Sequence, residues 1–97
     1  MSVHTFLDMD FEWDPTKAIA NRRKHNVRFA EAATVLEDEH AITVPEEHPD
    51  ELRFVTMGVD SQGRLLVVVY CHRGQRIRVI SARRANKRER QAYESDT

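Results

Sequence analysis

The chain has 97 residues, of which 40% are hydrophobic and 32% charged, and a formal net charge of −1 at pH 7. These values fit one globular domain with a modest core, and no apolar run is long enough to span a membrane. The single cysteine, Cys71, excludes an internal disulfide bond and favours a cytoplasmic location; because apolar residues flank it, we expect a buried, unreactive thiol.

The N-terminal part of the chain is expected to be a tail followed by helices. We expect a flexible tail over residues 1–10, ahead of a single domain over residues 11–97, with Phe11-Glu12-Trp13 as a short extended segment. Asp14-Pro15 is typical of a helix start, because Asp accepts a free backbone N–H and Pro tolerates the first helical position. This predicts a helix over Thr16–His25 that stops at Asn26 in a left-handed conformation.

A second helix and a run of strands follow. Phe29, Ala32, Ala33 and Leu36 recur at helical spacing and predict an apolar stripe that faces the core. Beyond them the sequence predicts four strands and a last helix, at Ala41–Val44, Leu52–Val59, Arg64–Cys71, Arg76–Ala82 and Ala85–Tyr93. The polar stretch 45–50 is expected to be a loop, and 60–63 and 72–75 to be turns. The fold class is therefore α+β, with two N-terminal helices, a four-stranded, mainly antiparallel sheet and a C-terminal helix, in the order ααββββα.

The near-neutral net charge hides a strong asymmetry along the chain. Up to Asp60 there are six Lys or Arg and thirteen Asp or Glu, whereas from Ser61 onward there are nine and three. Seven of the nine later cations fall between Arg73 and Arg88. A surface of this cationic density attracts a polyanion, most commonly RNA or DNA. The alternative is a solvated face, or neutralisation by the acidic half of the chain.

The arginines of the last two strands are the first candidate site. Arg is suited to bind phosphate, because its planar guanidinium presents paired donors. Arg73 ends one predicted strand and Arg76 begins the next. A two-residue turn would make them cross-strand neighbours, with Arg78 on the same face and Arg83 on the opposite one. A three-residue turn would group them differently, and the sequence leaves both possibilities open.

Other candidates are scattered along the chain. Lys24 and His25 could transfer protons or stabilise a leaving group, or they could simply stabilise the C-terminus of the first helix. Glu51 and Arg53 would share a strand face, as an ion pair or as a base and a phosphate clamp. Tyr93 could pack or contact a phosphate. The five histidines show no metal-ligand spacing, and we expect neither a metal site nor another cofactor.

Taken together, these residues resemble the BrnT-like toxins, the ribonuclease half of a bacterial type II toxin–antitoxin pair. The resemblance covers the chain from Phe11 to Glu94, and its most specific part follows Arg73-Gly74. Its motif residues are Phe11-Glu12-Trp13-Asp14-Pro15, Lys17-Ala18, Asn21, Lys24-His25, Val27, Phe29, Glu31-Ala32, His48, Glu51, Arg53, Arg73-Gly74, Arg76–Arg83, Ala85, Glu89-Arg90 and Tyr93-Glu94. Asn26 stands where Gly is usual, and His72 where an acidic or small polar residue is common.

The resemblance implies a RelE-like fold and a metal-independent endoribonuclease that cleaves RNA by attack of the 2′-OH and inhibits translation. It also implies a cognate antitoxin that is BrnA-like and has a ribbon-helix-helix DNA-binding domain. Toxin and antitoxin would form a hetero-oligomer, and the toxin would contact operator DNA only through the antitoxin. The catalytic candidates are Lys24, His25, Glu51, Arg73 and Arg83, and the RNA-binding candidates are Arg53, Arg76, Arg78 and Tyr93. The alternative is a non-catalytic module that binds nucleic acid or antitoxin in autorepression.

Overall fold

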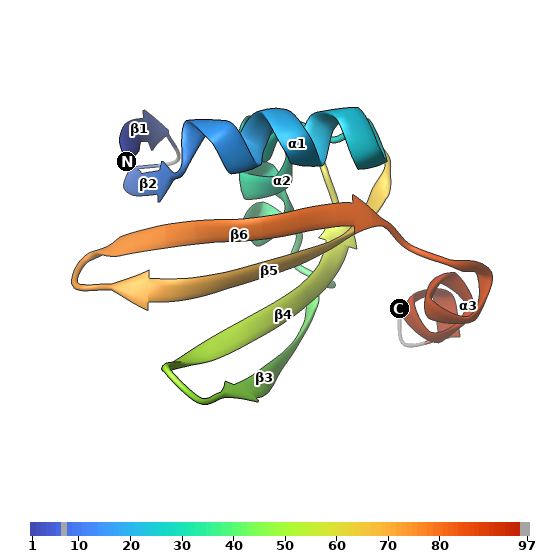
Figure 1. The fold of residues 1–97 in the computed structure, drawn as a ribbon. Coiled ribbons are helices and arrows are strands. Elements are labelled where there is room, and N and C mark those ends of the chain that lie inside the picture. The colour runs from blue at the N-terminus through green and yellow to red at the C-terminus, as the bar shows by residue number, and fades with distance from the viewer. Residues whose placement is uncertain (7, 96–97) are drawn as a thin grey trace.

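Among the residues that the structure, a computed structural model, describes (1–6 and 8–95), six strands form one mixed sheet in the order β1-β2-β6-β5-β4-β3 (Figure 1). The strands are β1 (Ser2–Phe6), β2 (Met9–Trp13), β3 (Ile42–His48), β4 (Glu51–Val59), β5 (Leu65–Arg73) and β6 (Arg76–Arg84). The helices are α1 (Pro15–His25), α2 (Phe29–Ala33), the 3₁₀ turn η1 (Thr34–Glu37) and α3 (Lys87–Ser95). None of these described helices is long and apolar enough to cross a membrane.

Helix α1 begins and ends where the sequence predicted. The Thr16 N–H donates to Asp14 Oδ1 at 2.9 Å, and Pro15 occupies the first turn. Asn26 adopts a left-handed conformation with φ 57° and ψ 35°, which stops the helix. α1 runs along β6 on the side where β2 has ended (Figure 1).

The second predicted helix is shorter than its apolar stripe. α2 ends at Ala33 and the chain continues as η1, yet the stripe still faces the core: Phe29, Ala32 and Ala33 are buried and Leu36 packs against them. The same core contains Phe11, Trp13, Val27, Val35, Leu66, Val68, Tyr70, Ile77, Val79 and Ala82. Because side chains alternate along a strand, the other face of the sheet receives the intervening residues.

The N-terminal segment corrects the expected architecture. A flexible tail over residues 1–10 and a four-stranded sheet were expected, but β1 and β2 form an antiparallel pair and β2 joins β6 in parallel. Burial of Phe11 and Trp13 anchors this segment in the sheet. The order is therefore ββααββββα rather than ααββββα, and the sheet is mixed. Leu7 and residues 96–97 lie outside the described part of the chain.

The predicted loop at 45–50 is also wrong. β3 continues to His48 and pairs with β4 throughout, so only Pro49 and Asp50 remain for the turn. β3 is the last strand of the sheet. Pro45 is therefore tolerated within it, because an edge strand needs backbone donors on one side only.

Candidate active site

The hairpin between β5 and β6 brings two of the candidate arginines together. Its turn has two residues, Gly74 and Gln75, and Gly74 adopts a φ of 61°, which glycine reaches without steric penalty. Arg73 and Arg76 are directly opposite each other in the ladder. This confirms the two-residue alternative and puts Arg78, two residues further along β6, on the same face.

A row of side chains crosses the sheet beside this turn. Arg53 of β4 lies opposite Cys71 of β5, Cys71 lies opposite Arg78 of β6, and Arg78 lies opposite Glu12 of β2. Opposite residues share a face, so this row lies on the face away from α2. We call the polar side chains on and next to this row the hairpin patch: Asp10, Glu12, Glu51, Arg53, Arg73, Arg76 and Arg78.

Carboxylates hold some of the arginines of the hairpin patch in fixed positions. Nε and Nη2 of Arg78 donate to Glu12 Oε2 at 2.9 and 2.7 Å, and Glu12 is only 6% exposed. Nε of Arg53 donates to Glu51 Oε2 at 3.0 Å, and this hydrogen bond is the main cause that lowers the pKa of Glu51. Glu51 is therefore a carboxylate at neutral pH.

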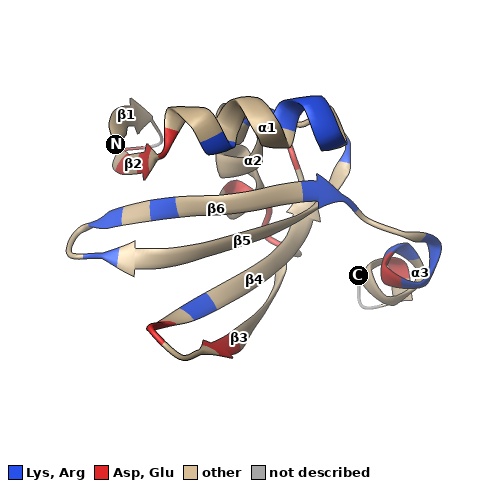
Figure 2. Ribbon diagram, viewed as in Figure 1, with Lys and Arg blue, Asp and Glu red and all other residues tan. Residues whose placement is uncertain are grey.

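The other two arginines of the patch are available to a ligand. The Arg76 side chain is 49% exposed, and its only ion pair within the described residues is a long one to Glu12 at 3.9 Å. Arg73 is exposed and forms no ion pair with a described residue. Both line an open depression of about 540 Å³ together with Asp10, Glu12, Gly74, Gln75 and Arg78. Figure 2 shows these cations at the tip of the β5–β6 hairpin.

A smaller pocket of about 120 Å³ adjoins the patch where α1 begins. Lys17 and Asp14 line it together with Glu51, Arg53 and Arg78. Cys71 lies buried beneath the patch, as expected, and burial first and Glu51 second raise the pKa of its thiol. A buried thiol with a raised pKa is a poor nucleophile, so the chemistry of the patch belongs to its carboxylates and cations.

Arg83 is not where strict alternation predicted. Val69 pairs with Ser81 and Tyr70 with Val79, so Ile80 is an extra residue and forms a β-bulge. The bulge turns Arg83 to the face of Arg78 rather than to the opposite one. The two arginines are nevertheless five residues apart on one strand, or roughly 16 Å.

At that distance Arg83 belongs to a different cluster. Its Nη1 and Nη2 donate to the two carboxylate oxygens of Glu89 in α3, both at 2.8 Å. This pairing lowers the pKa of Glu89 to about 2. Tyr93 follows on α3 and donates its hydroxyl to Asp38 Oδ2 at 2.5 Å, which raises the pKa of Tyr93 to about 12. Both candidates therefore anchor α3, away from the hairpin patch.

Lys24 and His25 also lie outside the patch. They occupy the last turn of α1, and Lys24 is seven residues, or about 10 Å along the helix axis, beyond Lys17. Figure 2 shows the basic end of α1 beside the end of β6 and opposite to the hairpin. The structure thus unites Glu51, Arg53, Arg73, Arg76 and Arg78, and it separates from them Lys24, His25, Arg83 and Tyr93.

Sequence reasoning missed four residues around the patch: Asp10, Glu12, Lys17 and His48. The first two reach it through the parallel pairing of β2 with β6. His48 lies opposite Glu51 in the β3–β4 ladder, and Nδ1 accepts the Asp50 N–H at 3.2 Å, so Nε2 carries the proton of the neutral ring. Glu12, Lys17 and His48 belong to the motif residues that carry the family resemblance, and this membership was the signal in the sequence that could have identified them as site residues. No group of three or more His, Cys, Asp or Glu that could hold a metal ion occurs within the described residues.

Comparisons with known proteins agree with the resemblance seen in the sequence. A family model described as "Ribonuclease toxin, BrnT, of type II toxin-antitoxin system" matches residues 13–89. The fold is similar to the crystal structure of the Brucella abortus ribonuclease toxin, BrnT, with a TM-score of 0.65 and 25% identity, over 79% of this chain and 96% of that one. Sequence comparison with curated proteins gave no match. Since the family model spans most of the sequence, this chain belongs to the BrnT family of ribonuclease toxins of type II toxin–antitoxin systems.

Proposed function

We propose that this chain is a metal-independent endoribonuclease toxin whose active site is the hairpin patch, and that RNA cleavage there inhibits translation. One observation carries the proposal. Two exposed guanidinium groups, Arg73 and Arg76, border the same depression as the fixed Arg78–Glu12 pair, and the Glu51–Arg53 pair adjoins it. Family membership supplies the reaction class, and the patch supplies groups suited to it.

Cleavage by the 2′-OH requires a base, an acid and stabilisation of a charged phosphorane. Arg73 and Arg76 bind the scissile phosphate and stabilise its negative charge. Glu51, ionised because its pKa is lowered, accepts the proton of the 2′-OH. His48 donates a hydrogen bond from Nε2 to the departing 5′ oxygen, and this oxygen takes its proton from solvent water. In this proposal Arg78 and Arg53 are positioning residues, which Glu12 and Glu51 hold in place.

The same proposal includes the partner. A cognate antitoxin, BrnA-like and with a ribbon-helix-helix domain, binds the toxin in a hetero-oligomer and neutralises it. Operator DNA is contacted through the antitoxin alone. Membership of a type II toxin family supports the partnership.

A non-catalytic binding module is the second candidate, and one observation favours it. Carboxylates already occupy the guanidinium groups of Arg53, Arg78 and Arg83. Purified protein that binds RNA but leaves it intact, with antitoxin removed, would support this alternative.

The decisive experiment is cleavage of a defined RNA in the presence of EDTA. We expect Arg73→Ala and Arg76→Ala to lower the rate by about 100-fold each, as loss of a donor to a developing charge does. Arg23→Ala, which removes an exposed cation outside the patch, is the matched control and should keep full activity. Circular dichroism verifies the fold of each variant. Full activity of both patch variants, together with loss in His25→Ala or Arg83→Ala, would refute the hairpin patch as the active site.

A further inference from the structure

A second hollow surface lies between α1 and the start of α2, and none of its residues belongs to the hairpin patch. An apolar cavity of about 260 Å³ is lined by Trp13, Ala18, Ile19, Phe29 and Ala30. A polar cavity of about 380 Å³ is lined by Asn26, Glu31, Gln62 and Arg64. Arg22 and Arg28 line both cavities. We call the combined surface the α1–α2 groove.

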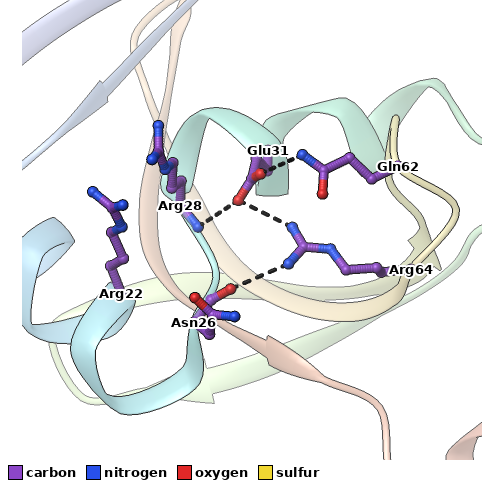
Figure 3. Close-up of a pocket in the computed structure, with 6 residues that line it drawn as sticks. All are labelled: Arg22, Asn26, Arg28, Glu31, Gln62 and Arg64. Carbon is purple, nitrogen blue, oxygen red and sulfur yellow. Dashed lines mark hydrogen bonds and ion pairs between the residues drawn. The ribbon is translucent and has the colours of Figure 1, made fainter.

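Internal bonds fix the polar half of the α1–α2 groove (Figure 3). Arg64 binds Asp60 Oδ2 through Nε at 3.1 Å and Nη2 at 2.9 Å, Glu31 Oε1 at 3.0 Å, and the Asn26 carbonyl at 3.1 Å. Glu31 also accepts the Gln62 amide at 2.6 Å. This wall is therefore rigid, and its own charges are already paired.

Arg22 and Arg28 differ from this wall. Both are exposed, and neither forms an ion pair with any residue in 1–6 or 8–95. Figure 3 shows their side chains extending in the same direction, with the guanidinium groups turned away from Glu31 and Arg64. Beside them Ile19, which is 55% exposed, lines the apolar cavity. Two unpaired cations thus border an unfilled apolar hollow.

We propose that the α1–α2 groove is a docking site for an acidic, amphipathic segment of the cognate antitoxin. An apolar side chain of that segment fills the hollow beside Ile19 and Trp13, while its carboxylates pair with Arg22 and Arg28. Charge complementarity selects an acidic occupant. The apolar half favours a protein over RNA, because a phosphate backbone gains nothing from Ile19. The proposal rests on the antitoxin partnership proposed above, but not on the hairpin patch or on catalysis.

The test measures binding of the full-length antitoxin of the same operon to the full chain by isothermal titration calorimetry. We expect the double variant Arg22→Glu with Arg28→Glu to weaken binding by roughly 100-fold, since it reverses both charges that face the partner. Ile19→Ser should weaken binding by roughly tenfold through loss of apolar contact. Arg23→Glu, which changes the next residue of the same helix outside the groove, is the control.

Wild-type affinity for the antitoxin in the double variant overturns the proposal. Unchanged antitoxin affinity with impaired RNA binding also overturns it and assigns the groove to RNA. Weakened antitoxin binding together with normal RNA cleavage supports the proposal. If the wild type proves unable to cleave RNA, weakened antitoxin binding still supports the α1–α2 groove as a docking site, and only the proposed ribonuclease activity fails. Should the double variant melt early, Arg22→Gln alone, at an exposed helical position, gives the same comparison.

Discussion

The Asn21 side chain replaces a missing strand, which makes it the most informative residue to change. β2 pairs with β6 only as far as Arg78, so the following residues of β6 have no strand on that side. Asn21 of α1 occupies this position. Its Oδ1 accepts the Ala82 N–H at 3.1 Å, while its Nδ2 donates to the carbonyl oxygens of Ala82 at 2.8 Å and of Val27 at 3.1 Å.

Asn21→Ala leaves these groups without partners in a buried site, because Asn21 is only 8% exposed. Each lost hydrogen bond costs on the order of 1 kcal/mol, so the three together predict a loss of about 3 kcal/mol. That is a large part of the roughly 5–15 kcal/mol that stabilises a typical domain. Asn21→Asp keeps the acceptor but loses both donors and sets a carboxylate against two carbonyl oxygens. We expect it to be at least as destabilising at neutral pH.

Urea unfolding followed by circular dichroism and by the fluorescence of Trp13, the single tryptophan, measures both variants. Arg23→Ala on the exposed side of the same helix is the control and should change stability by no more than about 0.5 kcal/mol. A loss below about 1 kcal/mol in Asn21→Ala, with an unchanged denaturant slope, would show that Asn21 does not replace a strand energetically.

Three further outcomes concern the contacts of α3 and η1. The Arg83 hydrogen bond lowers the pKa of Glu89 to about 2, so the ion pair stabilises fully above the ordinary value of 4.5 and is lost as pH falls through about 2. Because Arg83 is 42% exposed, we expect urea unfolding at pH 6 to show that Glu89→Gln is only about 1 kcal/mol less stable than the wild type. This difference in stability should vanish near pH 2. A difference that stays constant with pH would contradict the assignment of the lowered pKa to this ion pair. Gly58→Ala adds a Cβ 2.9 Å from Val35 Cγ1 in η1 and 3.1 Å from Asp38 Oδ2, so thermal unfolding should reveal a loss of stability of about 1–3 kcal/mol. An unchanged melting temperature would mean that η1 shifts freely. Tyr93→Phe removes the hydrogen bond to Asp38, so amide hydrogen exchange in α3 should accelerate. The alkaline absorbance titration of the variant should also lose a step near pH 12. Unaltered exchange would show that other contacts hold α3 in place.

Local patterns predicted the parts of the fold that local chemistry determines. The start of α1 at Asp14-Pro15 and its stop at Asn26 follow from capping, and both are confirmed. The parallel pairing of β2 with β6 could not be predicted in this way, because it joins residues more than sixty positions apart. Strand β1 was missed because its sequence lacks the apolar alternation that marks a half-buried strand. In the structure its residues are only partly buried or exposed.

The candidate site shows the same division. Arg73, Arg76 and Arg78 follow from one two-residue turn, which residue types alone make plausible. Arg83 was assigned to the wrong face because a bulge at Ile80 changes the parity of every later residue on β6. No feature of the sequence at Ile80 marks it as an extra residue, so alternation alone could not predict the face on which Arg83 lies.

The charge asymmetry that first suggested a polyanion receives a more specific explanation from the pairing. Acidic residues of the N-terminal part neutralise particular arginines of the basic part: Glu12 binds Arg78, and Glu31 with Asp60 binds Arg64. Neutralisation by the acidic half, the alternative considered for the sequence, is therefore real but selective. Some of the cations that form no such pair lie in two separate places, at the hairpin tip and at the basic end of α1 (Figure 2). Because the two surfaces are separate, substitutions at one leave the charges of the other unchanged, so the proposed RNA site and the proposed antitoxin site can be tested independently.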